Sequence, residues 1–170
     1  MKLKFFLALF FGFVFLGNLT YSQSNQKSIA PELTLNLPIG LASQVYNLGY
    51  GLHIQDQFPL GKSNFDFLLR SGVDIFPGKT LNAGIYTINV ATGVAIPFLL
   101  GGRYYVANGF HLDLESGVFI GVSGGASTVF DFAPAIGYSF GGFDPLVRFN
   151  TRFQSGTSSF SFGARYQFKL

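Results

Sequence analysis

The chain has 170 residues, enough for one domain, and 48% of them are hydrophobic and 18% aromatic. Only 11% are charged, against roughly 25% in ordinary soluble domains, so the composition is too apolar for a disordered chain. There is no cysteine, which excludes a disulfide scaffold, a thiolate metal site and a cysteine nucleophile.

The N-terminus has the layout of a secretion signal. Lys2 and Lys4 precede a 13-residue apolar stretch, and Thr20 and Ser22 are small residues that fit a cleavage site before Gln23. A membrane anchor is the alternative, but a transmembrane helix needs about 20 apolar residues. We predict a signal peptide at 1–22, a short N-terminal tail at 23–31 and the folded domain at 32–170. Once the signal is removed, nine basic residues face eight acidic ones, which gives no reason to expect nucleic acid as a partner.

From Leu33 onward apolar and polar residues alternate with a period of two, which is typical of β-strands. Clusters of turn residues divide this alternation, and Ala107-Asn108-Gly109 is the strongest hairpin signal among them. Eight strands are predicted, over 33–39, 48–54, 65–75, 86–104, 110–122, 130–140, 147–153 and 160–170. The second, fourth and sixth links are the most turn-like, as an up-and-down antiparallel order requires. These links are 58–64, 106–109 and 141–145.

The alternation fits a soluble barrel or sandwich with an apolar core, or a membrane barrel with its apolar side chains in lipid. Every arginine and five acids fall on the polar side of the strands, whereas the lysines after the signal lie in the tail, turns, loops or the C-terminal end. The arginines and acids are Arg70, Arg103, Arg148, Arg152, Arg165, Asp66, Asp74, Asp113, Glu115 and Asp131. A solvated face would mix lysine into its strands, while a sealed lumen favours arginine, which pairs with carboxylates. We therefore predict an all-β fold, an eight-stranded antiparallel up-and-down transmembrane β-barrel over 32–170, with a soluble lipocalin-like carrier as the alternative.

Eight strands enclose only enough space for side chains, so the predicted lumen is filled and polar rather than an open pore. Five arginines against five acids give it a net charge near zero. Inward glycines are expected to make room for the long arginines. Three strand prolines, Pro38, Pro97 and Pro134, are interpreted as bulges or strand ends because proline cannot donate to the ladder.

Three segments resemble the small eight-stranded outer-membrane β-barrel proteins of diderm bacteria. Residues 95–105 are similar to the strand before the middle periplasmic turn, and 135–140 and the ending 164–168 have the same alternation of aromatic residues and glycine. The family's last strand usually ends at an aromatic residue, whereas this chain adds Lys169 and Leu170. The resemblance implies residence in the outer membrane, contact with its lipid, assembly by the barrel-assembly machinery and an extracellular ligand bound through the loops.

Few residues suggest chemistry. Gly61-Lys62-Ser63 lacks the preceding glycine of a phosphate loop, since position 56 is Asp56. His111 shares an inward column with Asp113 and Glu115, which suits a metal ligand or general base, but a lumen hydrogen-bond network is the preferred interpretation. His53 has the same inward orientation. We therefore predict no catalytic residue, cofactor or metal site.

Two functions remain open. The first is a non-enzymatic outer-membrane barrel that serves envelope structure, adhesion or loop-mediated binding. The second is a barrel that modifies lipid or binds or transports a small ligand.

Overall fold

The computed structural model describes residues 26–61, 63–84, 86–107, 109–123, 127–153 and 155–170. The predicted signal peptide at 1–22 lies outside these residues, as does Lys62 of the Gly61-Lys62-Ser63 motif. Within the described part of the chain, no helix is long and apolar enough to cross a membrane.

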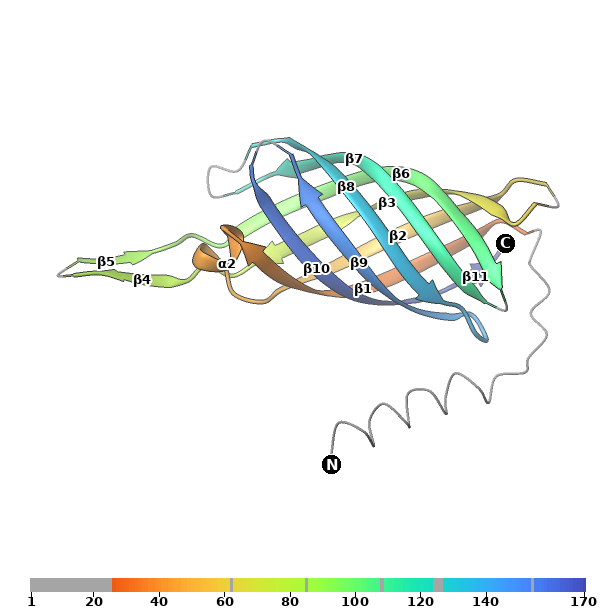
Figure 1. The fold of residues 1–170 in the computed structure, drawn as a ribbon, viewed down its shortest axis with the longest axis horizontal. Helices are drawn as coiled ribbons and strands as arrows, with labels where there is room; N and C mark the ends of the chain where they lie inside the picture. The colour runs from red at the N-terminus through yellow and green to blue at the C-terminus, as the bar shows by residue number, and fades with distance from the viewer. Residues whose placement is uncertain (1–25, 62, 85, 108, 124–126, 154) are drawn as a thin grey trace, which may run out of the picture.

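Eight antiparallel strands close into a tilted barrel (Figure 1). They are β1 (Ser28–Gly40), β2 (Gly49–Pro59), β3 (Phe65–Phe76), β6 (Gly93–Ala107), β7 (Phe110–Gly121), β8 (Val129–Tyr138), β9 (Phe143–Arg152) and β10 (Thr157–Tyr166). Consecutive barrel strands pair with one another, and the first strand closes the barrel against the last in a register that joins Glu32 to Arg165 and Gly40 to Thr157. The short strand β11 (Phe168–Lys169) continues the wall beside the start of β1. The predicted fold class is therefore confirmed.

The two ends of the barrel differ, as Figure 1 shows. At one end, here called the turn end, short links join β2 to β3, β6 to β7 and β8 to β9, and the C-terminus lies beside them. At the other, the loop end, the link from β9 to β10 is also short, but the other three connections are longer. They include the one-turn helix α2 (Ala42–Val45) and a second, two-stranded sheet of β4 (Thr80–Ala83) and β5 (Tyr86–Asn89). The positions of the three short links are those expected from the sequence. In barrels of this topology short turns face the periplasm and long loops face outward.

Several predicted boundaries differ from the structure, and three of the differences are described here. β1 begins at Ser28, so the last four residues of the predicted tail pair with β2 and β11. The predicted strand 86–104 is divided into β5 and β6, because its first part pairs with β4 in a hairpin that projects beyond the wall. The predicted turn 141–145 is shorter, since β9 already starts at Phe143.

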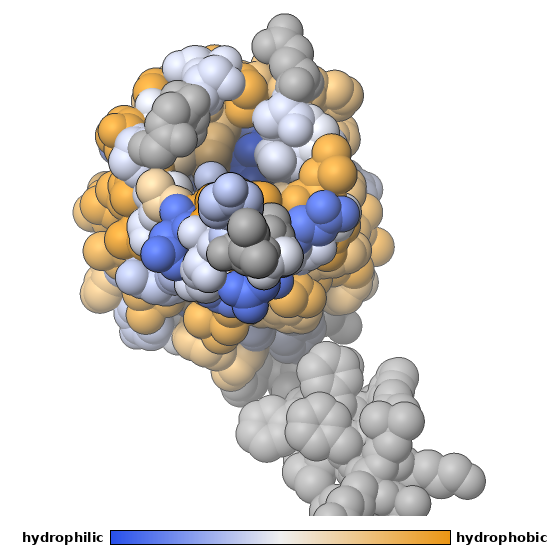
Figure 2. All heavy atoms as spheres, turned by 90° about the vertical axis from the view of Figure 1, so that its left-hand side faces the viewer, coloured by the Kyte–Doolittle hydropathy of each residue, from blue (hydrophilic) through white to orange (hydrophobic). Residues whose placement is uncertain are grey.

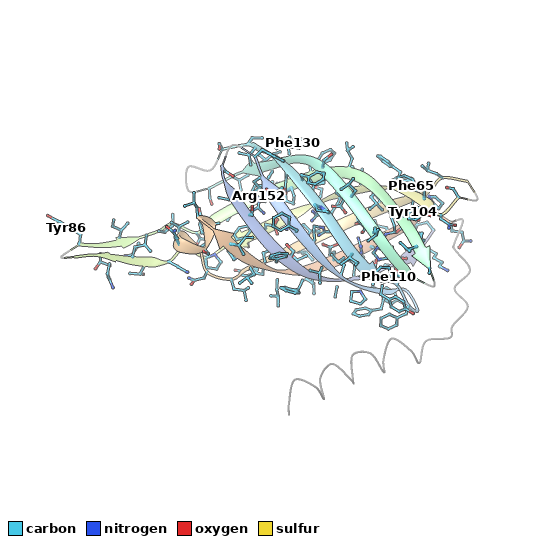
Figure 3. The ribbon with its side chains drawn as sticks, in the orientation of Figure 1. Phe65, Tyr86, Tyr104, Phe110, Phe130 and Arg152 are labelled. Atoms are coloured by element: carbon cyan, nitrogen blue, oxygen red, sulfur yellow. The ribbon has the colours of Figure 1, made fainter. Side chains whose placement is uncertain are left out.

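Apolar side chains cover the outer wall. Leu33, Leu52 and Leu114 are 66%, 60% and 54% exposed, and their sequence neighbours on each strand point inward and are buried. Aromatic residues gather on the wall near the turn end, where Figure 3 shows Phe65, Tyr104 and Phe110. Such an aromatic girdle beside an apolar belt is what a membrane interface requires. The soluble alternative needs the opposite arrangement, with the apolar side chains inside, and is wrong.

The strand prolines do not shift the register. Pro97 pairs with Phe119 and Pro134 with Leu114 in unbroken alternation, and the one register shift recorded among the described barrel pairs lies between Tyr105 and Ala107. Instead the ladder on one side is interrupted: the β3–β6 pairing omits Pro97 and the β8–β9 pairing omits Pro134. Pro38 lies beyond the last pair between β1 and β2. The strand-end interpretation therefore holds for Pro38 and the bulge interpretation is wrong for the other two, since a missing donor interrupts one ladder without inserting a residue.

Candidate functional site in the barrel interior

The turn-end half of the lumen contains two carboxylates shared by two arginines and a histidine. Arg103 holds Asp113 with two hydrogen bonds, of 2.8 Å from Nε to Oδ1 and 2.9 Å from Nη2 to Oδ2. Arg165 donates to Asp144 from Nε at 2.7 Å and to Asp113 from Nη2 at 2.8 Å. His111 lies between the same carboxylates, with Nδ1 2.8 Å from Asp113 and Nε2 2.8 Å from Asp144. All of these side chains are buried. This half is consequently cross-linked from β6 and β7 to β9 and β10.

A second group of ion pairs crosses the middle of the barrel. Arg148 on β9 donates to both oxygens of Glu32 on β1, at 2.6 Å and 3.2 Å. Arg70 donates from Nε to Glu115 at 2.7 Å, and a further oxygen of Glu115 lies 3.5 Å from Arg148. Glu32 is also 3.5 Å from Arg165, which connects the middle group to the turn-end group.

Amides and hydroxyls fill the lumen above the ion pairs. Asn36 donates to Asp74 at 2.7 Å, Ser161 donates to Asn36 at 2.5 Å, and Asn150 donates to Ser161 at 2.6 Å. His53 lies beside this chain of bonds, with Nε2 3.3 Å from Asp74. The described side chains thus bridge opposite walls at three successive levels of the lumen, and the predicted filled, polar interior is present.

The charge balance of the lumen differs from the prediction. Glu32 and Asp144 are fully buried, so seven carboxylates face five arginines, and the two histidines lie next to carboxylates. Sequence reasoning missed Glu32 because it stood at the predicted edge of the tail, and Asp144 because it stood in the predicted turn. The alternation along the strand would have identified both residues. Glu32 points to the same side of β1 as Asn36, and Asp144 points to the same side of β9 as Arg148.

His111 has one of its two expected acidic neighbours. It contacts Asp113, whereas Glu115 pairs with arginines and the second neighbour of His111 is Asp144. Both ring nitrogens lie at hydrogen-bond distance from carboxylate oxygens, so neither is free to take a proton from a serine or to bind a metal ion. Within the described residues no group of three histidine, cysteine or carboxylate side chains has metal-site geometry. The network interpretation therefore fits the geometry better than a catalytic one.

Inward glycines were expected to make room for arginines. At Gly137 and Gly51 the neighbouring side chains are instead histidines. A Cβ on Gly137 would come within 2.5 Å of Cε1 and 2.7 Å of Nε2 of His111. A Cβ on Gly51 would come within 2.6 Å of Cε1 of His53 and also clash with Asp74. The absence of a side chain leaves room for the His111 imidazole against Gly137 on the neighbouring strand β8, and for the His53 imidazole beside Gly51 on its own strand β2.

The interior changes character at the loop end, where it opens into a cavity of about 220 Å³. Phe76, Phe119 and Val129 form an apolar cluster there, against which Tyr46 packs. The Arg152 guanidinium stacks on the Phe119 ring, 3.8 Å from its centroid. Figure 2 looks onto this end, which is hollowed between hydrophilic and neutral side chains and surrounded by the apolar outer wall. Sequence reasoning placed Arg152 among the lumen charges and gave no signal of a cavity.

No family model matches the chain, and no curated protein matches it either. Solved structures do share the fold. The outer membrane protein Ail of Yersinia pestis in a phospholipid bilayer nanodisc aligns with a TM-score of 0.59 at 10% identity, over 85% of this chain and 100% of Ail. Neisserial surface protein A aligns with a TM-score of 0.54 at 11% identity, over 85% of this chain and 97% of that one. A de novo designed transmembrane β-barrel aligns with a TM-score of 0.55 at 8% identity, over 87% of this chain and 100% of the design.

These alignments show the fold, and the distribution of side chains shows which surface meets lipid. The closed wall leaves no free edge between barrel strands, the belt outside is apolar, and the charges are buried inside. The chain is a small eight-stranded transmembrane β-barrel that shares its fold with these outer-membrane proteins.

Proposed function

We propose that this protein is a non-enzymatic outer-membrane barrel that is closed to solutes and holds a binding hairpin above the membrane. The observation that carries the proposal is the lumen network, in which ion pairs and amide bonds join opposite walls at successive levels. His111, the candidate general base, supports this proposal because both of its ring nitrogens already lie at hydrogen-bond distance from carboxylates.

The hairpin of β4 and β5 supports the binding role. It projects from the loop end beyond the barrel wall, and Figure 3 shows Tyr86 near its tip. Leu81 is the cross-strand partner of Ile88, so these two side chains lie on the same face of the hairpin. Tyr86 is two residues from Ile88 on β5 and therefore shares that face. Tyr86 and Ile88 are 69% and 53% exposed. An apolar face held outside the membrane favours a protein surface as its partner over a polyanion.

Planar-bilayer recording tests the closed state. Purified protein is expected to give no steady conductance steps, because eight strands leave no water column once the interior is filled. The alternative, a transporting barrel, would produce reproducible steps in the unmodified protein and would refute the proposal.

Cysteine labelling tests the display of the hairpin, and the chain is well suited to it because it has no cysteine. Tyr86→Cys should react with a membrane-impermeant maleimide on intact cells. Leu60→Cys, an exposed position in a turn-end link, is the matched control and should react only after the outer membrane is permeabilised. The reverse pattern would show that the hairpin faces the periplasm and would remove the binding role.

A further inference from the structure

The loop-end cavity has its own arginine, which the lumen network does not use. Four of the five lumen arginines have an ion pair of 4.0 Å or less, namely Arg70, Arg103, Arg148 and Arg165. Arg152 has none among the described residues, although it is only 7% exposed. Its Nε has no hydrogen-bond partner. A guanidinium that is buried to this extent without a direct ion pair leaves hydrogen-bonding capacity unused, so an anion that reaches it gains a strong, charge-assisted contact.

Asp131 and Asp74 attract Arg152 electrostatically, but neither carboxylate forms an ion pair with it within 4.0 Å. Asp131 is its cross-strand neighbour on β8, yet no ion pair joins them and Oδ1 of Asp131 is itself without a partner. Asp74 on β3 receives the side-chain amide of Asn36 at 2.7 Å. Both carboxylates disfavour a second anion nearby, so a ligand has to approach Arg152 from the cavity side, where the wall is apolar.

Aromatic rings hold the guanidinium and form that wall. Arg152 lies 3.8 Å from the centroid of Phe119 and 5.3 Å from that of Phe76, which fixes its plane by cation–π contact. Tyr46 packs against Phe76 with ring centroids 6.0 Å apart. Rings that orient the guanidinium leave its hydrogen-bonding edge for an incoming group and offer an apolar surface beside it.

The cavity is blind. Pro38, Phe76 and Arg152 line it, and two residues deeper on the same three strands lie Asn36, Asp74 and Asn150 of the hydrogen-bonded lumen layer. Figure 3 places Arg152 near the loop end of the wall, above the rest of the lumen. A ligand can therefore enter from the loop end and bind but has no path onward.

We propose that this cavity binds a small apolar carboxylic acid, whose carboxylate pairs with Arg152 and whose apolar body packs against Phe76, Phe119 and Tyr46. The size fits: a cavity of about 150 Å³ accommodates benzene, and the volume here is about 220 Å³, which leaves room for a carboxylate on one ring. The site is independent of the hairpin and extends the function from display to recognition of a small molecule.

The test uses 4-fluorobenzoate as the probe, with the full chain purified in a non-ionic detergent and binding followed by fluorine NMR. Saturable binding below about 10 mM is expected, and the uncharged 4-fluorobenzamide should bind at least about tenfold more weakly. Inorganic phosphate, which has charge but no apolar body, should compete at least about tenfold more weakly than unlabelled benzoate.

Two variants locate the site. Arg152→Gln removes the charge and should weaken 4-fluorobenzoate binding by about tenfold or more, without changing the already weak binding of the benzamide. Lys79→Gln is the matched control, because it removes a positive charge at the same end from a side chain bonded to Ser43 instead of the cavity. Its affinity should stay within about twofold of the unmodified protein.

Several results would overturn the proposal. These are no saturation in the unmodified protein, equal binding of acid and amide, equal competition by phosphate, or unchanged affinity in Arg152→Gln. Heat-dependent gel mobility shows whether each variant is folded. If Arg152→Gln does not fold, the comparison of acid, amide and phosphate in the unmodified protein still decides the chemistry, and Phe119→Leu, which should weaken binding of both organic probes, decides the location.

Discussion

The ion pair between Glu32 and Arg148 gives the sharpest test of the lumen. It is bidentate, with Nη1–Oε1 at 2.6 Å and Nη2–Oε2 at 3.2 Å, and both side chains are fully buried. Arg148→Met and Glu32→Gln, made singly and together, remove one charge, the other, or both. Gln has the shape of glutamate, and Met is an unbranched uncharged replacement for arginine, although its side chain is shorter.

The expected loss of unfolding free energy depends on the ion-pair partners that remain for the unsubstituted charge. Breaking a buried pair by removing one partner costs roughly 3–5 kcal/mol. Without Arg148, Glu32 still has Arg165 at 3.5 Å and Arg70 at 4.0 Å, so the loss should be near the lower limit, about 3 kcal/mol. In the double variant neither charge of the pair is stranded, so its loss should fall short of the sum of the single losses by roughly 2–3 kcal/mol.

Urea unfolding in lipid vesicles measures these losses. Because the chain has no tryptophan, far-UV circular dichroism and the heat-dependent gel shift are the suitable probes. Lys169→Met, which removes an exposed charge, is the control and should stay within about 0.5 kcal/mol of the unmodified protein. Strictly additive losses, with a coupling under about 0.5 kcal/mol, would show that the pair does not act as a unit and would refute the reasoning.

Three further predictions concern the wall, its closure and a close contact. Phe149 packs against Phe160, with ring centroids 5.2 Å apart, and Phe149→Arg should lower the free energy of unfolding by roughly 2–4 kcal/mol near the bilayer midplane. Phe149→Leu should lower it by under about 1.5 kcal/mol, and equal losses in vesicle unfolding would contradict the lipid-facing assignment. A chain ending before Phe160 loses most of β10, which pairs with both β9 and β1, and should fail to show the heat-dependent gel shift after membrane extraction; a normal shift would argue against closure by this strand. Gly137→Ala should push His111 away from Asp144 and lower the free energy of unfolding in urea by about 1–3 kcal/mol. Gly40→Ser, at an open loop-end position, is the control and should affect stability only through its backbone angle. An unchanged unfolding free energy in Gly137→Ala would mean that the imidazole is free to move.

The wall of the barrel could be predicted from the sequence because lipid and lumen impose opposite chemistries on alternate residues. The pattern remains continuous through Pro97, where Ile96 and Phe98 face outward while Ala95 and Leu99 are buried. A period of two needs no knowledge of distant contacts, so it survives even where the ladder is interrupted.

Partners inside the lumen could not be predicted, because they depend on how strands stagger around the barrel. His111 was expected beside Asp113 and Glu115 on its own strand, yet its second neighbour, Asp144, comes from β9. The cavity at Arg152 escaped prediction for a related reason. It arises where Phe76 and Phe119 replace polar residues on the inward side of different strands, and a parity map of one strand does not show that they meet.

The pair of Glu32 and Arg148, 116 residues apart, also has a consequence for assembly. Glu32 belongs to β1, while its partners Arg148 and Arg165 belong to β9 and β10. These two ion pairs therefore form only when the last barrel strands reach the first. A partly built sheet inserted into lipid would expose that charge together with an unpaired edge, which the hydrocarbon does not tolerate. The order of events is therefore constrained: the lumen side must stay hydrated until β10 meets β1, and water leaves only as the ring closes. Contacts of such long range also make spontaneous closure slow, and this delay is the step that an assembly catalyst would shorten.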